Sequence, residues 1–91
     1  MKRLTLKIYG DVQNVFFRQN VFDVAKELNL TGWVRNDKDG CVSVVAEGEE
    51  NKLNELLDYC SEGPKMSMVE DVVEKREHIK AKKFEEFKII Y

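Results

Sequence analysis

The order in which strand-like and helix-like hydrophobic patterns follow one another constrains this chain more than any other feature of its sequence. Apolar and polar side chains alternate over residues 3–9, the period-two pattern of a strand with one buried face, and Gly10 is expected to end that strand. Residues 19–29 carry apolar side chains at helical spacing, with Asn29 as a plausible stop. The chain therefore begins with a strand, a loop and a helix.

The middle of the chain predicts a hairpin and a second helix. Residues 31–36 and 41–47 are rich in strand-forming residues and are separated by the turn-forming sequence Asp-Lys-Asp-Gly, so they should pair as an antiparallel hairpin. Within residues 48–64, acidic residues open a helical pattern and the pair Gly63-Pro64 ends it. The apolar face of this helix consists of Leu53, Leu56, Leu57 and Cys60.

Two further strands complete the pattern. Residues 68–78 are rich in valine but interrupted by charge, and residues 84–91 alternate apolar and polar side chains. The order β-α-β-β-α-β with an extra strand predicts an α+β fold of the ferredoxin-like type. This is a split β-α-β sandwich in which two helices cover one face of an antiparallel sheet of four to five strands. Because 91 residues suffice for one domain but not for two, residues 1–91 are expected to form a single domain.

The overall charge argues against a nucleic-acid-binding protein. Lys and Arg number 15 against 17 Asp and Glu, with an isoelectric point near 5.4, whereas nucleic-acid binding depends on basic residues that neutralise phosphates. An RNA-binding module of the same fold is further disfavoured because no aromatic ribonucleoprotein motif is present. The N-terminal residues alternate in polarity and form no continuous apolar stretch, so we expect no signal peptide, no membrane association and a cytoplasmic location.

The cysteine and histidine residues predict neither a metal site nor a disulfide. Cys41 and Cys60 fit no metal-ligand spacing, and two cysteines in a cytosolic chain are usually reduced and structural. His78 lies in a charged run with no second His or Cys near it, so a solvated surface histidine is the favoured interpretation. We expect no metal and no cofactor.

One loop carries candidate chemistry. The sequence Gly-Asp-Val-Gln-Asn-Val-Phe-Phe-Arg, residues 10–18, connects the first strand to the first helix and delivers Arg18 to the helix start. Unpaired N–H groups at a helix N-terminus together with a guanidinium form an anion site in outline. The alternative is a surface arginine with Val15 and Phe17 as core anchors, and from this loop alone the alternative is favoured.

A second motif changes that balance. The loop sequence followed by Gly-Trp-Val-Arg-Asn-Asp-Lys-Asp-Gly resembles the acylphosphatase family, whose pattern is Gly-x-Val-Gln-Gly-Val-x-Phe-Arg and then Gly-Trp-Val-(Arg or Lys)-Asn with a downstream Gly. The resemblance spans essentially the whole chain and includes Gly63-Pro64 and Tyr91. The matching motif residues are Gly10, Val12, Gln13, Val15, Phe17 and Arg18, then Gly32, Trp33, Val34, Arg35, Asn36 and Gly40.

The resemblance implies a metal-independent hydrolase that converts an acyl phosphate to a carboxylate and inorganic phosphate, the latter being product and inhibitor. It implies that Arg18 and backbone N–H groups of the loop bind the phosphoryl group and that Asn36 orients the attacking water. The loop residues concerned are Gln13, Asn14, Val15, Phe16 and Phe17. Arg35 and Asn36 alternate along a strand and point to opposite faces, and the resemblance assigns the role to Asn36. Without the resemblance, the sequence favours the interpretation of Asn36 as a turn residue.

Several details remain open from the sequence. Trp33, Phe16 and Phe17 are expected to be packing residues. Asn14 stands where the family has glycine, and Asp11 places a carboxylate close to the expected dianion. Both departures leave a non-catalytic anion-binding or regulatory domain as an alternative, against which the presence of both Arg18 and Asn36 argues. A monomer is the default expectation, and the physiological acyl phosphate is not specified.

Overall fold

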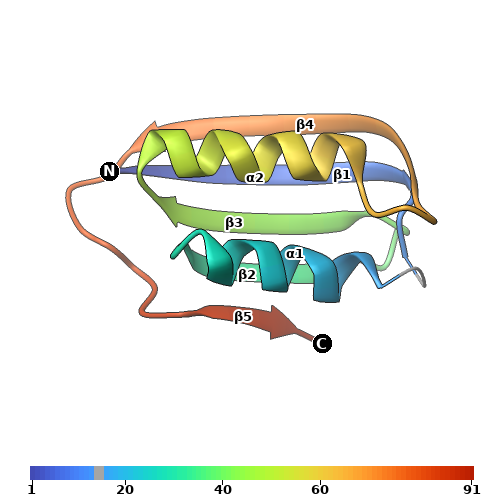
Figure 1. Cartoon of the computed structure of the whole chain (residues 1–91), viewed down its shortest axis with the longest axis horizontal. Helices are drawn as coiled ribbons and strands as arrows, with labels where there is room; N and C mark the ends of the chain where they lie inside the picture. The colour runs from blue at the N-terminus through green and yellow to red at the C-terminus, as the bar shows by residue number, and fades with distance from the viewer. Residues whose placement is uncertain (14–15) are drawn as a thin grey trace.

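The computed structural model describes residues 1–13 and 16–91, so the predicted phosphate-binding residues Asn14 and Val15 lie outside the described part. Within these residues the chain forms five strands and two helices in the predicted order (Figure 1). These elements are β1 (Lys2–Asp11), α1 (Phe17–Glu27), β2 (Thr31–Asn36), β3 (Val42–Gly48), α2 (Glu50–Glu62), β4 (Met68–His78) and β5 (Phe87–Ile90). They match an α+β ferredoxin-like sandwich.

The five strands form one sheet in the order β4-β1-β3-β2-β5. β1 pairs antiparallel with β3 and β4, and β2 pairs antiparallel with β3, but β5 runs parallel to β2. The sheet is therefore mixed: the predicted antiparallel pairing holds for every pair of neighbours except β2 and β5. The segment after β4 crosses to the opposite edge while staying at one end of the sheet (Figure 1), so β5 must run opposite to β4, the direction that β2 already has. Alternating polarity over residues 84–91 carries no information about strand direction.

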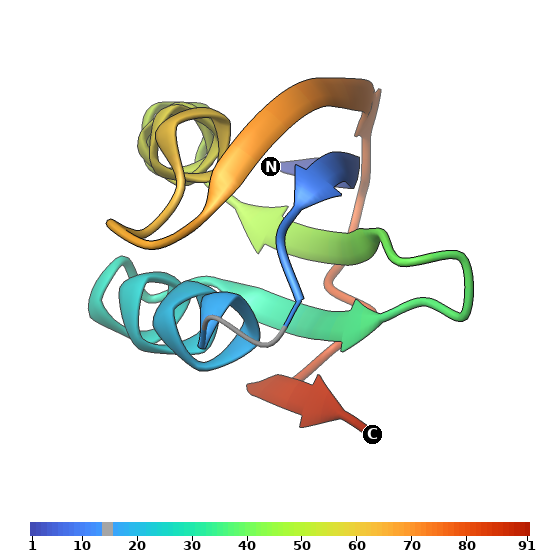
Figure 2. The ribbon, with the colours of Figure 1, turned by 90° about the vertical axis from the view of Figure 1, so that its right-hand side faces the viewer.

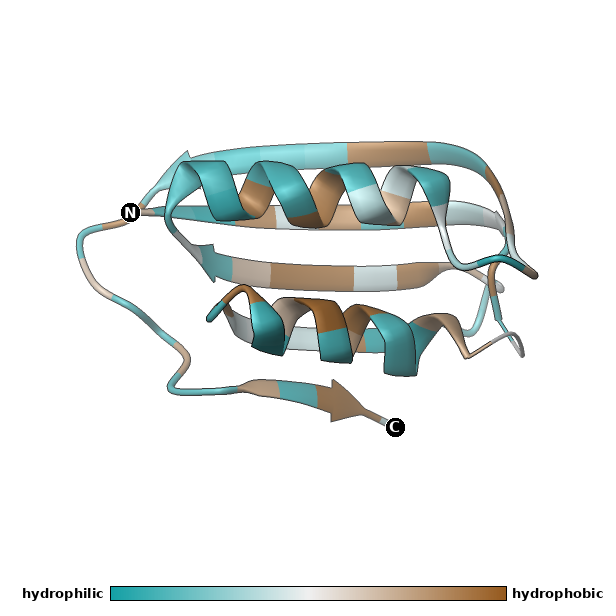
Figure 3. Ribbon diagram, viewed as in Figure 1, coloured by the Kyte–Doolittle hydropathy of each residue, from teal (hydrophilic) through white to brown (hydrophobic). Residues whose placement is uncertain are grey.

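Both helices cover the same face of the sheet, as predicted (Figure 2). Leu4, Leu6 and Ile8 of β1 point toward the helices and are fully or almost fully buried, while the residues between them stay partly exposed. Hydropathy follows the same division, with the apolar residues of both helices turned toward the sheet (Figure 3). The core between the layers thus follows directly from the period-two and helical patterns.

Gly10 does not end the first strand as predicted. β1 continues through Gly10 to Asp11, and its register with β4 shifts between Tyr9 and Gly10. Gly10 has a φ of 129°, and a Cβ atom there would collide with the carbonyl oxygen of Met68. Glycine permits this close approach of two backbones inside the sheet, so it marks a bulge and not a strand end.

The first helix is also displaced from its predicted range. It runs from Phe17 to Glu27, and Asn29 follows it with a φ of 58°. Asparagine is one of the few residues other than glycine that tolerates this left-handed conformation. Asn29 therefore acts as the expected stop signal, although the last helical residue lies before it.

A buried carboxylate ties the segment between β4 and β5 to the sheet. Glu47 on β3 is fully buried, receives hydrogen bonds from the backbone N–H groups of Lys83 (2.7 Å) and Phe84 (3.3 Å), and pairs with Arg3 at 2.6 Å. Burial alone would raise the pKa of Glu47, but these hydrogen bonds and the Arg3 charge hold it below its ordinary value. This contact fixes the crossing segment that leads into β5.

The cysteines and His78 lie where the sequence placed them. Cys41 and Cys60 are free and buried, and His78 is exposed on β4. Within residues 1–13 and 16–91, no cluster of three or more His, Cys, Asp or Glu side chains could hold a metal ion. No helix in the described part of the chain is long and apolar enough to cross a membrane.

Candidate active site

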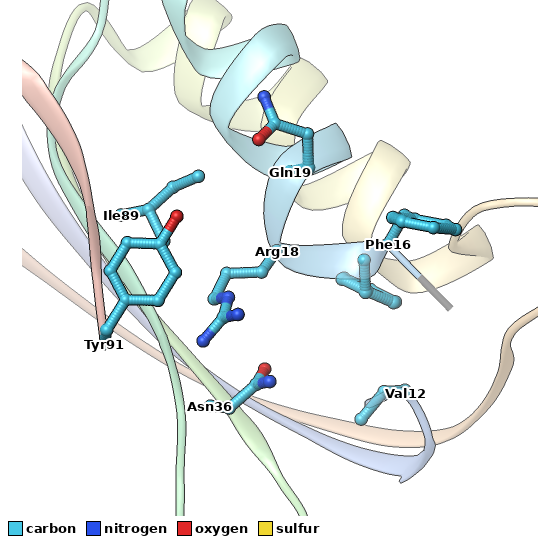
Figure 4. A pocket seen from close by; sticks show the side chains of 8 residues that line it. Val12, Phe16, Arg18, Gln19, Asn36, Ile89 and Tyr91 are labelled. Atoms are coloured by element: carbon cyan, nitrogen blue, oxygen red, sulfur yellow. The ribbon is translucent and has the colours of Figure 1, made fainter. Parts of the chain in front are cut away.

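A pocket of about 400 Å³ opens at the N-terminal end of α1, between this helix and the ends of β2 and β5 (Figure 4). It brings together Arg18 from the helix and Asn36 from the last position of β2, the two residues that the sequence predicted as catalytic. The full lining consists of Val12, Phe16, Phe17, Arg18, Gln19, Asn36, Ile89 and Tyr91.

The N-terminus of α1 has a positive electrostatic potential that favours an anion. Among the described residues no side chain caps it, and its first turn contains no acidic residue. Helix N-termini carry partial positive charge and usually attract Asp or Glu. Here the first turn instead contains the cation Arg18, which adds to the positive potential. A bound anion would satisfy both the free N–H groups and the guanidinium.

Phe16 and Phe17 take opposite positions at this helix start. Phe17 is buried to 1% exposure in the core, which confirms it as an anchor, whereas Phe16 is 82% exposed. The prediction that Phe16 is a core residue is therefore wrong. Phe16 precedes the helix in the left-handed conformation, with φ 59° and ψ 22°, and this turns its side chain outward (Figure 4).

Arg18 is held by an aromatic ring and not by a carboxylate. Its guanidinium carbon lies 4.6 Å from the centre of the Tyr91 ring, within the range of a cation–π contact. None of the ion pairs formed within residues 1–13 and 16–91 involves Arg18. The guanidinium is directed into the pocket toward Asn36 (Figure 4). Its charge therefore remains available for a bound anion.

Asn36 faces the pocket because strand residues alternate between the two faces of the sheet. Val34, two residues earlier on β2, is buried beneath the helices, and Asn36 shares its side. Arg35 points to the opposite face, where its guanidinium lies 4.8 Å from the centre of the Trp33 ring and pairs with Asp37 at 3.0 Å. The predicted division between Arg35 and Asn36 thus agrees with the geometry.

The side-chain oxygen of Asn36 is buried, and no described residue donates a hydrogen bond to it. An unpaired buried acceptor costs about 1–3 kcal/mol, so such atoms usually have a partner. The Asn36 amide also lines the pocket beside Arg18, so a rotation of this amide would present the oxygen to a molecule bound there.

The side chain of Gln13 anchors the loop and does not line the pocket. Its Nε2 donates hydrogen bonds to the backbone oxygens of Asp37 (2.8 Å) and Cys41 (2.9 Å). Both bonds tie the start of the loop to the connection between β2 and β3, directly after Asn36. The predicted part of Gln13 in phosphate binding can therefore concern only its backbone N–H group. Asp11 is exposed and does not line the pocket.

No role was predicted for the pocket wall that lies along β5. Ile89 of β5 and Tyr91, the residue directly after this strand, both line the pocket, and β5 pairs with β2 up to Arg35 and Ile90. Tyr91 belonged to the matched family pattern, but without a function. Its place beside Arg18 depends on the parallel pairing of β5, a contact between distant segments that periodicity does not encode.

Comparison with known proteins agrees with this geometry. The family model "Acylphosphatase" matches residues 4–89. The chain belongs to the acylphosphatase family. An acylphosphatase of Syntrophus aciditrophicus is 37% identical over 91 residues, covering 100% of this chain and 94% of that protein. An acylphosphatase of Marinobacter nauticus is 46% identical over 72 residues, covering 79% and 78% of the two chains.

The fold comparison points the same way. The crystal structure of acylphosphatase from Bacillus subtilis superimposes with a TM-score of 0.94 at 33% identity and covers 100% of both chains. As a member of the acylphosphatase family, the protein is a hydrolase that acts on acyl phosphates, with inorganic phosphate as a product.

Proposed function

We propose that Arg18 binds the phosphoryl group of the acyl phosphate and that Asn36 orients the attacking water. The observation that carries this proposal is that the Asn36 side chain lines the same pocket as Arg18, an arginine that has no carboxylate partner in the described chain. A planar guanidinium can donate two parallel hydrogen bonds to phosphate oxygens. An amide oxygen can accept a hydrogen bond from water and so direct the water's lone pair toward phosphorus.

The reaction needs little else from the protein. Water attacks phosphorus, the bond between phosphorus and the bridging oxygen breaks, and the carboxylate leaves without needing a proton. The proton released by the water can pass to a phosphate oxygen of the substrate, so a strong protein base is not required. Positioning and charge stabilisation dominate phosphoryl transfer. The pocket offers both through Arg18, Asn36 and the open helix N-terminus.

The backbone N–H groups of the loop complete the proposed phosphate site. Those of Phe16 and Phe17 lie at the start of α1, where the positive end of the helix dipole favours an anion. Gln13, Asn14 and Val15 precede them in the loop. We further propose a cytoplasmic monomer that binds no nucleic acid, in line with its formal net charge of −2.

Replacement of Arg18 and of Asn36 should have different kinetic consequences. We expect Arg18→Ala to abolish both turnover and inhibition by phosphate, because the fixed fork of donors is lost. We expect Asn36→Ala to lower kcat about 100-fold or more while phosphate inhibition remains, because water orientation matters mainly in the transition state. Steady-state hydrolysis of benzoyl phosphate, with and without added phosphate, measures both quantities.

Arg35→Ala provides the matched control, since Arg35 is adjacent to Asn36 but on the opposite face of the sheet. It should leave kcat and phosphate inhibition nearly unchanged. Competitive inhibition by phosphate that survives in Arg18→Ala, or that disappears in Asn36→Ala, would contradict the proposed roles.

Removal of divalent metal ions should not affect the reaction. The described residues offer no cluster of metal ligands, and the proposed chemistry uses the Arg18 guanidinium where metal-dependent phosphatases use a metal ion. We expect kcat/KM to be the same before and after dialysis against EDTA. A loss of activity that added Mg²⁺ or Zn²⁺ restores would refute metal independence.

A further inference from the structure

The pocket is larger than the phosphoryl group needs. Its volume is about 400 Å³, whereas one water molecule occupies about 30 Å³ in the liquid, so five phosphate heavy atoms would fill only part of it. The volume lies at the lower end of the range of about 300–1,000 Å³ typical of sites that enclose small organic ligands. The remaining space is available to the acyl group, the other half of the substrate.

The pocket has a polar part and an apolar part. Arg18 and Asn36 lie together in its centre, and Ile89 and Tyr91 form an apolar wall on one side of the guanidinium (Figure 4). Ile89 packs against the core and is fixed by its pairing with Val34. The Ile89 part of the wall therefore rests on the paired sheet, and Tyr91 extends the wall directly beyond the last paired residue, Ile90.

Tyr91 is the unusual member of this wall. One face of its ring lies against the Arg18 guanidinium at 4.6 Å, yet the residue remains 89% exposed. Exposed aromatic side chains at the edge of a pocket are a common feature of binding sites, because they offer a large apolar surface at low entropy cost. A leaving group that departs from phosphorus toward β5 would contact the Tyr91 ring first.

We propose that Tyr91, together with Ile89, forms a subsite for the acyl group and makes the protein prefer acyl phosphates with an aromatic acyl group over acetyl phosphate. This inference rests on the proposed phosphate position beside Arg18. The acyl group would pack on the Tyr91 ring and on Ile89 while the phosphoryl group binds Arg18. Tyr91 is thus a specificity-determining residue, and its ring also limits the directions in which Arg18 can point.

The test compares two substrates in one set of variants. We expect the ratio of kcat/KM for benzoyl phosphate to kcat/KM for acetyl phosphate to fall about fivefold in Tyr91→Ala. A partly open wall should contribute less than the roughly 10-fold or more that a missing methylene costs in an enclosed pocket. Tyr91→Phe retains the ring and should retain the ratio. Ile90→Ala shortens the side chain next to Tyr91, which lies on the opposite face of the sheet. This variant should leave the ratio unchanged.

The ratio separates a specificity role from a purely positioning role. If the ring acted only by holding Arg18, Tyr91→Ala would lower both substrates by the same factor, and the proposal would be overturned. It would also be overturned if Ile90→Ala lowered the ratio as much as Tyr91→Ala, because the effect would then come from loosening β5.

A binding measurement keeps this test independent of turnover. Benzylphosphonate and methylphosphonate present an aromatic or a small apolar group on a phosphonate that cannot be hydrolysed. We expect calorimetric titration to show about fivefold tighter binding of benzylphosphonate in the wild type and loss of this preference in Tyr91→Ala. If neither acyl phosphate is hydrolysed, the proposed function fails, and the phosphonate preference alone decides on the subsite. Equal binding of both phosphonates by the wild type refutes the subsite.

Discussion

At the residue scale, Phe16 and Phe17 show how strongly a helix start can separate two identical neighbours. Phe17 is the first residue of α1 and is buried, whereas Phe16 takes a left-handed conformation and is exposed. A non-glycine residue in this region carries a conformational cost of about 1–2 kcal/mol. Such strain is found preferentially at functional sites, and here it lies at the edge of the pocket.

The two phenylalanines should respond very differently to substitution. We expect Phe17→Ala to lower the free energy of unfolding by about 3–5 kcal/mol, because it leaves a cavity in the core. We expect Phe16→Gly to change it by less than about 1 kcal/mol, since the relief of left-handed strain offsets the added entropy of the unfolded chain. Urea denaturation measures both values. A large loss in Phe16→Gly would show that the exposed ring has a packing role after all.

At the scale of the elements, the buried face of α2 determines the chemistry of its cysteine. Cys60 lies on this face with Leu53 and Leu56, and burial raises the pKa of its thiol to about 12. Cys41 lies directly before β3, and burial likewise raises the pKa of its thiol. The Asp39 carboxylate raises it further. Since the thiolate is the reactive form, both groups are protected by charge state as well as by access.

We therefore expect neither cysteine to react with a disulfide reagent such as DTNB in the native protein at about pH 8, close to the ordinary thiol pKa of about 8.5. In denaturant two thiols per chain should react, which equals the number of cysteines in the sequence. Absorbance of the released thiolate gives the number of reactive groups. A thiol that reacts rapidly without denaturant would contradict the buried positions.

At the scale of the whole molecule, the site depends on segments that are far apart in the sequence. The loop before α1, the end of β2 and β5 all contribute to one pocket. Gln13 joins the loop to the β2–β3 connection, and Glu47 holds the segment that carries the chain across to β5. Interactions outside the pocket thus fix the relative positions of Arg18, Asn36 and Tyr91.

Glu47 should contribute to stability in a pH-dependent manner. We expect Glu47→Gln to lower the free energy of unfolding by about 1–3 kcal/mol at neutral pH, because charged hydrogen bonds to Arg3 and the crossing segment are weakened. The folded pKa of Glu47 lies below its ordinary value of 4.5. The stabilisation is therefore present above pH 4.5 and is lost as the pH falls through the lower, folded pKa.

Thermal or urea unfolding between neutral and acidic pH should show the difference between wild type and Glu47→Gln narrowing as the pH falls. Glu50→Gln is the control, since Glu50 pairs with Lys2 at the exposed surface, where ion pairs contribute little. A difference that stays constant over the whole pH range would show that the Glu47 charge is not what holds the crossing segment.

Much of this protein was determined by its sequence alone, because the decisive signals are local. Period-two and helical patterns specified all strands and both helices, and alternation along β2 separated Asn36 from Arg35. The two motifs identified the family and its candidate residues Arg18 and Asn36. These signals need only neighbouring residues, so tertiary contacts could sharpen the element boundaries, as at Gly10, without changing the order of the elements.

The tertiary structure decided what depends on the path of the chain through space. It set the parallel direction of β5, because a crossing segment at one end of the sheet leaves no other direction. It also turned Phe16 outward, made the Gln13 side chain a structural link, and placed Tyr91 against Arg18. Each of these depends on contacts between segments distant in sequence or on one backbone angle at a junction. Neither a hydrophobic period nor a motif spacing contains that information.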